Sequence, residues 1–216
     1  MIQAKPSLRG RFFWRNWSKW GTRLRFQQMR IVGETVADPQ RSILMVGNHI
    51  SWWDGFWPIE LNRRIWKKQY HVMMLEDQLK LRMFMREGGA FSIQPNSRDM
   101  LNSLKYAAEL LNDARNLVLM YPQGKIHSLY ESQIDFSPGV KKILKWTEKP
   151  VQVMMFVMLI DFGSFARPTL TYYLEEWQPG KGELGQAYQA FYATCLARQK
   201  KDLLSGKISP EEAASE

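Results

Sequence analysis

One apolar stretch is central to the predicted fold: Ser42-Ile-Leu-Met-Val-Gly47, which is followed directly by Asn48 and His49. A continuous apolar run of this length predicts a strand that is buried on both faces, as in a parallel sheet. Similar runs alternate with helical patterns along the chain, which indicates an α/β fold with a mixed, largely parallel central sheet flanked by helices. The other strands are predicted at 70–75, 90–94, 116–120, 151–160 and 168–174, and the helices at 52–67, 77–86, 97–112, 137–146 and 184–204.

The first 30 residues are strongly basic, with eight Lys or Arg and no acidic residue between Ile2 and Arg30. Their pattern predicts an N-terminal amphipathic helix that lies on a membrane surface with anionic lipids. The alternative is a helix packed on its own domain, with its Arg side chains in water. The apolar face comprises Phe13, Trp17, Trp20 and Leu24, and the basic face comprises Arg11, Arg15, Lys19 and Arg23.

Composition narrows the class of protein. The chain has 216 residues, a formal net charge of +9 and a pI of about 9.7, so its partners should be anionic. A single cysteine, Cys195, excludes an intrachain disulfide and suits a reducing compartment. No secretory signal is recognisable, and no apolar run approaches the roughly 20 residues of a membrane span. We therefore expect a peripheral protein on the cytoplasmic side of a membrane.

The expected domain organisation has three parts. Residues 1–30 are expected to form the basic membrane-surface helix, residues 31–206 one α/β domain, and residues 207–216 a flexible tail. The basic residues concentrate in the N-terminal helix, and no recognised nucleic-acid module is present, so no nucleic-acid partner is expected.

A histidine and an aspartate follow the strand at 42–47. His49 and Asp54 are separated by four residues, so a strand-to-helix turn can bring the carboxylate back onto the imidazole. The Asp would then fix the tautomer, and the other ring nitrogen would be free to take a proton from a hydroxyl. The alternative is a strand-end His satisfied by the backbone and an Asp that begins a helix.

A second polar block follows the strand at 116–120 and reads Tyr121-Pro-Gln-Gly-Lys125. Gly124 permits close approach of the backbone to a ligand, and Lys125 could pair with a phosphate. Functional groups of α/β sheets gather on loops after the carboxyl ends of strands. We therefore expect His49 and Gln123 to lie at the same edge of the sheet.

These blocks occur in the order seen in glycerolipid acyltransferases, together with Gly88-Gly-Ala-Phe91 and Phe136-Ser-Pro-Gly139. Over roughly residues 41–160 the chain resembles the 1-acylglycerol-3-phosphate O-acyltransferase superfamily. The resemblance implies a membrane-associated enzyme of lipid metabolism and phospholipid biosynthesis. It implies that His49 is the general base on an acceptor hydroxyl and that Asp54 is its partner. The hydroxyl would attack the thioester of acyl-CoA or acyl-carrier protein directly, without an acyl-enzyme, a metal or a cofactor.

The sequence departs from the family pattern where phosphate-accepting members carry Phe-Pro-Glu-Gly-Thr-Arg. Here Gln123 replaces the Glu, and the Arg is absent from its place. The family also places an Arg soon after the strand at 90–94, whereas in this chain the first Arg after that strand is Arg98. Arg grips phosphate bidentately and Lys does not, so the pattern argues against a glycerol-3-phosphate-type acceptor. It favours a neutral or differently charged hydroxylated lipid, or a sugar or amino-acid lipid, and leaves the choice among them open. The candidate substrate-binding residues are Gln123, Gly124, Lys125, Arg98 and His127.

A second class of function stays open at this point. A non-catalytic protein could use the same basic, Trp-rich surface to bind lipid or nucleic acid. Thiol release from acyl-CoA in the presence of lysolipid acceptors distinguishes an enzyme from such a binding protein.

Overall fold

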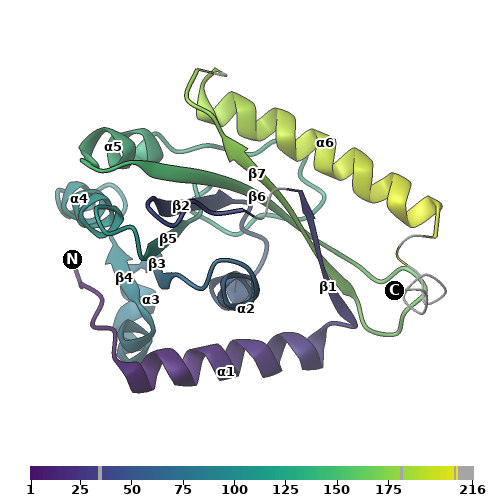
Figure 1. Cartoon of the computed structure of the whole chain (residues 1–216), viewed down its shortest axis with the longest axis horizontal. Helices are drawn as coiled ribbons and strands as arrows, with labels where there is room; N and C mark the ends of the chain where they lie inside the picture. The colour runs from purple at the N-terminus through teal and green to yellow at the C-terminus, as the bar shows by residue number, and fades with distance from the viewer. Residues whose placement is uncertain (34–35, 181, 207, 209–216) are drawn as a thin grey trace.

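A computed structural model describes residues 1–33, 36–180, 182–206 and 208 of the chain. At its centre lies a seven-stranded sheet in the order β1-β7-β6-β2-β5-β3-β4 (Figure 1). Its strands are β1 Gln28–Gly33, β2 Ser42–Gly47, β3 Gln69–Leu75, β4 Ala90–Ile93, β5 Asn116–Met120, β6 Val151–Asp161 and β7 Thr169–Trp177.

The strands run mostly in one direction. β6, β2, β5, β3 and β4 are mutually parallel along the sheet, whereas β7 is antiparallel to β6 and β1 is parallel to β7. The prediction of a mixed, largely parallel sheet is therefore confirmed. Because β2 and β5 are parallel neighbours, the loops that follow them leave the sheet at the same edge.

Helices cover both faces of the sheet. In Figure 1, α1 and α2 lie below it, and α4, α5 and α6 lie above it. Within β2, Ile43 and Met45 belong to the core on the α1 side, and Leu44 and Val46 belong to the core on the α6 side. This two-sided burial explains why β2 is apolar at successive positions. The helices are α1 Leu8–Arg25, α2 Trp57–Arg64, α3 Glu76–Lys80, α4 Asp99–Leu111, α5 Gly139–Trp146 and α6 Leu184–Leu204.

Two helices predicted as continuous are interrupted. The segment 52–67 divides into a 3₁₀ turn, η1 Trp52–Gly55, and α2, whose first turn contains Pro58. Proline is well tolerated there because the first turn has no intrahelical acceptor for its missing N–H. The segment 77–86 likewise divides into α3 and a second 3₁₀ turn, η2 Met83–Gly88.

The N-terminal region differs from the expected single helix over 1–30. The helix α1 ends at Arg25, and Gln28–Gly33 form strand β1, which pairs with β7. This edge strand is only partly buried and carries the polar residues Gln28 and Arg30, so it lacks the continuous apolar run that marks β2. The predicted tail at 207–216 lies outside the described residues, apart from the buried Ile208.

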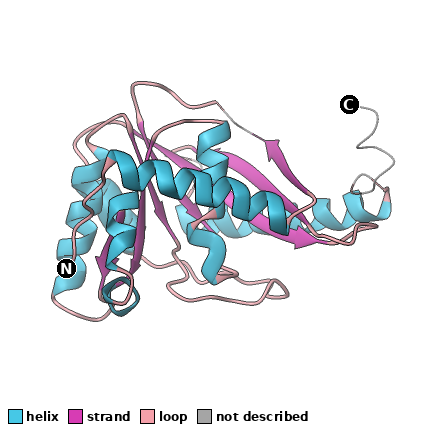
Figure 2. Cartoon of the chain, turned by 90° about the horizontal axis from the view of Figure 1, so that it is seen from below, coloured by secondary structure: helices cyan, strands magenta, loops and turns pink. Residues whose placement is uncertain are grey.

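The helix α1 runs along the α2 side of the molecule, in front of the sheet in Figure 2. A stripe of residues four positions apart buries it against the domain, and Trp14 stacks on Phe56 with ring centroids 5.3 Å apart. The Ser18 hydroxyl donates a hydrogen bond of 2.5 Å to the Phe56 carbonyl. In the described residues no helix is both long and apolar enough to cross a membrane. The buried stripe comprises Gly10, Trp14, Ser18 and Thr22.

Candidate active site

The loops after β2 and β5 meet at the carboxyl edge of the sheet. The backbone N–H of His49 donates to Oε1 of Gln123 at 2.6 Å, and the backbone N–H of His127 donates to the His49 carbonyl at 2.8 Å. This contact joins the loop after β2 to the loop after β5, although His49 and Gln123 are 74 positions apart in sequence. The expectation that His49 and Gln123 share one edge of the sheet agrees with this geometry.

His49 and Asp54 are in direct contact. Nδ1 of His49 lies 3.0 Å from Oδ2 of Asp54. The same carboxylate oxygen accepts the backbone N–H groups of Ile50 at 2.6 Å and Ser51 at 2.9 Å. The Ser51 hydroxyl accepts the N–H of Trp53 in return, which completes a capping box at the start of η1. A local turn motif therefore presents the carboxylate to the imidazole.

The Asp54 carboxyl group is fully buried, whereas the His49 side chain is 22% exposed. Burial raises the pKa of Asp54, and the hydrogen bonds from His49 and the Ile50 and Ser51 amides act in the opposite direction. The buried acid thus faces the protein, while the imidazole reaches the surface where a substrate can arrive. With its proton on Nδ1, His49 would keep Nε2 as an acceptor.

Two further residues hold this site, and neither was a predicted site residue. The Tyr121 ring stacks on the His49 ring with centroids 4.4 Å apart, and its hydroxyl donates to the Asp54 carbonyl at 2.6 Å. Asn48 exchanges two hydrogen bonds of 2.8 Å with the backbone of Met158 in β6. Both residues belong to stretches that the sequence analysis singled out, but their roles depend on long-range contacts.

The predicted substrate-binding residues after β5 lie next to His49. Gln123 is buried, and its Nε2 has no hydrogen-bond partner among the described residues. Gly124 adopts φ +68°, a left-handed conformation that favours glycine, and it is exposed together with Lys125. His127 contacts His49 through its backbone, and its buried Nε2 is likewise unpartnered in the described part of the chain.

Arg98 lies elsewhere on the sheet. It is exposed at the beginning of α4, after β4, and β5 and β3 separate that strand from β2. No polar contact among the described residues links Arg98 to His49 or Asp54. Its role in substrate binding stays a prediction, as do the roles of the residues after β5.

The groups assembled at this edge suit proton transfer. An imidazole held by a buried carboxylate can accept a proton from a hydroxyl and return it to a leaving group. Across the described residues, no group of three His, Cys, Asp or Glu side chains is arranged to hold a metal ion. Cys195 is buried in α6, and burial raises the pKa of its thiol to about 12, so it is not activated as a nucleophile.

Comparison with known proteins identifies the family. The Acyltransferase family model matches residues 28–157, which is more than half of the chain. The chain belongs to the acyltransferase family. The matched region contains His49, Asp54 and the block around Gln123, and it begins where β1 begins, after α1.

The fold agrees with that assignment. The chain is similar to the crystal structure of the 1-acyl-sn-glycerophosphate (LPA) acyltransferase PlsC from Thermotoga maritima, with a TM-score of 0.57 and 13% sequence identity. The similarity covers 89% of this acyltransferase and 79% of the PlsC chain. At that identity it shows a shared fold. No curated protein matches the chain.

Proposed function

We propose that this acyltransferase transfers a fatty acyl group from a thioester to a hydroxyl of a lipid acceptor, with His49 as general base and Asp54 as the residue that orients it. The observation that carries this proposal is the 3.0 Å contact between Nδ1 of His49 and Oδ2 of Asp54, in a chain of the acyltransferase family. A buried carboxylate on Nδ1 would direct Nε2 toward the substrate.

The proposed reaction needs no covalent enzyme intermediate. Nε2 takes the hydroxyl proton of the acceptor as the hydroxyl oxygen forms a bond to the thioester carbonyl carbon. The tetrahedral intermediate then collapses, the carbon–sulfur bond breaks, and the thiolate takes the proton from the imidazolium. Asp54 stabilises the imidazolium between these steps. The stacked ring of Tyr121 keeps the imidazole plane fixed.

The proposed donor is acyl-CoA or an acyl-carrier protein, and the reaction uses no further cofactor. The charge of the acceptor is inferred from the polar groups nearest His49. The loop after β5 offers the uncharged amide of Gln123 and one exposed cation, Lys125, with no arginine in that block. This supports a neutral or differently charged hydroxylated lipid over an acceptor gripped by an arginine fork.

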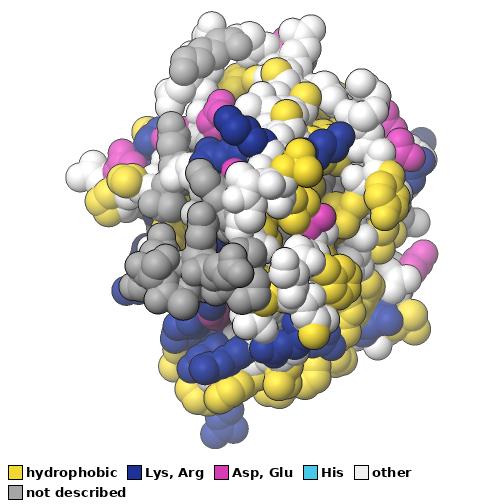
Figure 3. Space-filling model, turned by 90° about the vertical axis from the view of Figure 1, so that its right-hand side faces the viewer, with side chains coloured by type: hydrophobic (Ala, Val, Ile, Leu, Met, Phe, Trp, Pro, Cys, Tyr) yellow, Lys and Arg dark blue, Asp and Glu magenta, His cyan; other side chains and the backbone are white. Residues whose placement is uncertain are grey.

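We further propose that α1 docks the enzyme peripherally on an anionic membrane surface, on the cytoplasmic side. The predicted apolar face remains exposed although another stripe of α1 packs on the domain. Lys and Arg side chains lie beside hydrophobic side chains along the lower edge of Figure 3, where α1 is located. The apolar face comprises Phe13, Trp17, Trp20 and Leu24, with exposed fractions between 48% and 70%.

This exposed surface continues from α1 toward the catalytic turn. Trp52 of η1 and Phe84 of η2 are also exposed, and Phe84 stacks on Trp14 with centroids 5.6 Å apart. The Arg82 guanidinium lies 5.3 Å from the Trp52 ring, a pairing of cation and indole that suits a lipid interface. Because Trp52 is three residues after His49, docking would place the site beside acceptors held in the bilayer.

The chemistry is tested by thiol release from acyl-CoA and acyl-carrier protein with a panel of lysolipid and glycolipid acceptors. His49→Ala should lower kcat/KM by at least about 100-fold, because the acceptor hydroxyl loses its base. Thermal unfolding is measured in parallel, to show that the variant is folded. A folded His49→Ala enzyme with near-normal turnover would refute the mechanism.

Docking is tested by co-sedimentation with phosphatidylcholine vesicles, with and without phosphatidylglycerol, at low and high salt. Anionic vesicles should bind the enzyme and salt should release part of it, since each basic residue near such a surface contributes about 1 kcal/mol and is screened by ions. Leu24→Ser and the double variant Trp17→Ser and Trp20→Ser should bind less at every salt concentration. Leu204→Ser is the matched control, because Leu204 is exposed on α6 across the sheet. Equal binding by all variants would contradict docking through α1.

A further inference from the structure

A cavity of about 510 Å³ lies between the N-terminal half of α1, the carboxyl end of α2 and the beginning of β3. Gln69, the first residue of β3, lines it, whereas His49 follows the last residue of β2. Because β3, β5 and β2 are parallel neighbours, the cavity and the candidate active site are at opposite ends of the sheet. The cavity is therefore separate from the proposed chemistry.

The cavity is also separate from the proposed membrane contact. The α1 residues that line it lie on the flank of the helix opposite its exposed apolar face. Leu8 and Phe12 belong to this lining and are 88% and 70% exposed, so the cavity is open to solvent. A ligand of this cavity therefore arrives from water.

Basic side chains make up most of the polar lining. Five cationic side chains and no acidic side chain contribute to it. Such a concentration of one charge creates a positive potential that attracts an anion. The cations are Arg11, Arg15, Arg63, Lys67 and Lys68.

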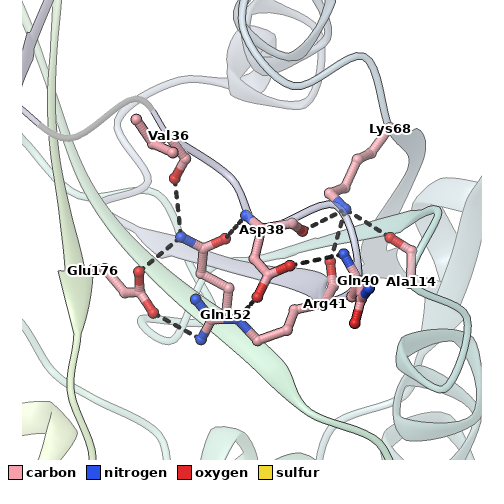
Figure 4. Close-up of polar contacts among 8 residues, drawn as sticks. All are labelled: Val36, Asp38, Gln40, Arg41, Lys68, Ala114, Gln152 and Glu176. Carbon is pink, nitrogen blue, oxygen red and sulfur yellow. Dashed lines mark hydrogen bonds and ion pairs between the residues drawn. The ribbon is translucent and has the colours of Figure 1, made fainter.

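Two of the five cations are already engaged by the protein. The Arg63 guanidinium donates to both carboxylate oxygens of Glu60, at 2.6 and 2.7 Å. The Lys68 ammonium donates to the carbonyls of Ala114 at 2.6 Å and Arg41 at 2.7 Å, as the close-up of this network shows (Figure 4). These two side chains shape the wall of the cavity, and their hydrogen-bonding capacity is largely used.

The other three cations have no acidic partner among the described residues. Arg11 donates from Nη2 to the neutral Oε1 of Gln69 at 2.7 Å, and its buried Nε is unpartnered in the described part of the chain. Burial and the positive charge of Arg115 lower the pKa of the Arg11 guanidinium, so an anion beside it would stabilise its charged form. Within the described residues, the side chains of Arg15 and Lys67 make no hydrogen bond or ion pair.

The backbone of Lys67 is an independent indication of a ligand site. Lys67 adopts φ +57°, in the left-handed region, just after the end of α2. Glycine and asparagine are the residues that usually accept this conformation after a helix, because other side chains make it strained. Strained backbone of this kind is common where a protein holds a ligand. A lysine at this position is therefore explained by what its ammonium binds.

The ring of Phe12 indicates the organic part of the ligand. It stacks on no other aromatic ring among the described residues, whereas the faces of Trp14 are stacked on Phe56 and Phe84. A free aromatic face beside guanidinium groups is the combination on which proteins stack a nucleobase while they bind its phosphates. The volume of the cavity suits a small organic ligand.

We propose that this basic cavity binds a soluble nucleoside diphosphate, with the phosphates against Arg11, Arg15 and Lys67 and the base on the ring of Phe12. Three cations without acidic partners match the negative charge of a diphosphate, and guanidinium groups match its geometry. The site depends on neither the proposed acyl transfer nor the proposed membrane docking. Because the ligand contacts both α1 and α2 of the folded chain, its binding also stabilises the fold.

The experiment is isothermal titration calorimetry of the full chain with ADP, in the absence of divalent cations. Pyrophosphate, which lacks the base, and adenosine, which lacks the phosphates, are titrated separately. One ADP should bind per chain, at least about tenfold more tightly than either other ligand. Equal affinity for pyrophosphate would overturn the assignment to a nucleotide, equal affinity for adenosine would overturn the role of the cations, and no binding of ADP would overturn the site.

Matched variants locate the site. Arg11→Gln and Phe12→Ala should each weaken ADP binding at least about tenfold. Arg9→Gln and Phe13→Ala are the controls, because these residues are exposed on the same helix and do not line the cavity. His49→Ala should bind ADP normally, so a failure of the chemistry and a failure of this site are distinguishable. Equal ADP affinity in all these variants, or equal weakening in the controls, would mean that ADP binds elsewhere and would overturn the proposal.

The variant Lys67→Gly separates ligand binding from folding. Glycine adopts a positive φ without strain, so the unliganded variant should be at least as stable in urea as the wild type. It lacks the ammonium, so its ADP affinity should be at least about tenfold lower. A stable Lys67→Gly protein that binds ADP as tightly as the wild type would overturn the role of Lys67 as a phosphate ligand.

Discussion

At the scale of single residues, the site depends on a carboxylate that is costly to bury. Oδ2 of Asp54 accepts three hydrogen bonds, while Oδ1 is buried without a partner among the described residues. Burial raises the pKa of the group, so its ionised form is less favourable in the folded state than in the unfolded state. A group of this kind is retained for what it does to its neighbour, which here is the ring of His49.

The variant Asp54→Asn separates this role from stability. The amide can still accept the backbone N–H groups, but it can also donate to Nδ1 and set the wrong tautomer. The value of kcat/KM should fall by at least about 100-fold. Because the pKa of Asp54 is raised on folding, its carboxylate weakens the fold as pH rises through that pKa. Thermal unfolding at pH 7 should therefore show no loss of stability in Asp54→Asn.

The control is Asp77→Asn, which removes an exposed carboxyl group from α3. Its turnover should stay within about twofold of the wild type, since surface substitutions away from special features have small effects. If Asp54→Asn kept normal turnover, or if both variants lost it equally, the orienting role of Asp54 would be wrong.

At the scale of the element, α1 has three distinct faces. One face packs on the domain, one is apolar and exposed, and one is basic. Packing requires glycine at one position, because a Cβ added to Gly10 would lie 2.6 Å from the Glu87 carbonyl oxygen and 2.4 Å from the Glu87 Cβ. The helix therefore approaches the end of η2 with backbone against backbone, as its hydrogen bond from the Ser7 N–H to Glu87 confirms.

The substitution Gly10→Ala should loosen α1. Overpacking against Glu87 should cost about 1–3 kcal/mol, which exceeds the roughly 1 kcal/mol that alanine contributes to helix formation. The measurements are the free energy of unfolding in urea and the rate of proteolysis within residues 8–25. Gly21→Ala is the matched control, because its added Cβ would meet only the end of the Arg25 side chain, at 3.2 Å. This second variant should be as stable as the wild type or more stable, and a stable Gly10→Ala would show that α1 is not tightly packed.

At the scale of the whole molecule, charge and apolar surface are distributed unevenly. The exposed apolar residues of α1, η1 and η2 lie on the α2 side of the sheet, with basic residues among them. The candidate active site and the basic cavity are at opposite ends of the sheet, and α2 runs between them. The exposed apolar surface and the candidate active site thus lie close together at η1.

The global stability should depend on pH through a histidine far from the active site. His71 in β3 is buried, and burial and the charge of Arg11 lower its pKa to about 4. The unfolded chain takes up the proton near pH 6.5 and the folded chain does not, so the free energy of unfolding falls as pH drops from 6.5 to 4. The loss attributable to His71 is at most about 3 kcal/mol.

Urea unfolding of the wild type and His71→Gln at several pH values measures this contribution. The carboxylates titrate in both proteins, so the difference between the two curves isolates His71. The variant should lose less stability than the wild type between pH 6.5 and 4. Parallel curves would show that His71 is protonated in the folded protein.

Much of the fold could be predicted because burial leaves a local pattern in the sequence. The strand Ser42–Gly47 could be predicted with the bounds that it has in the structure, because a strand covered on both faces is apolar at successive positions, here Ile43 to Val46. The contact between His49 and Asp54 was also within reach, because a turn of a few residues and the cap at Ser51 form it. Both features depend on residues that are close together in the chain.

The tertiary structure alone decided which surfaces meet. Strand β1 could not be predicted from the sequence, because an edge strand need not be apolar. It is defined by its pairing with β7, about 140 positions away in sequence. Trp14 packs on the domain while Trp17 stays exposed, although both are tryptophans of one helix. The basic cavity combines side chains from α1, α2 and β3. Periodicity in a sequence shows that a face must leave water, but a bilayer and a neighbouring element satisfy that requirement equally, and only the folded chain distinguishes them.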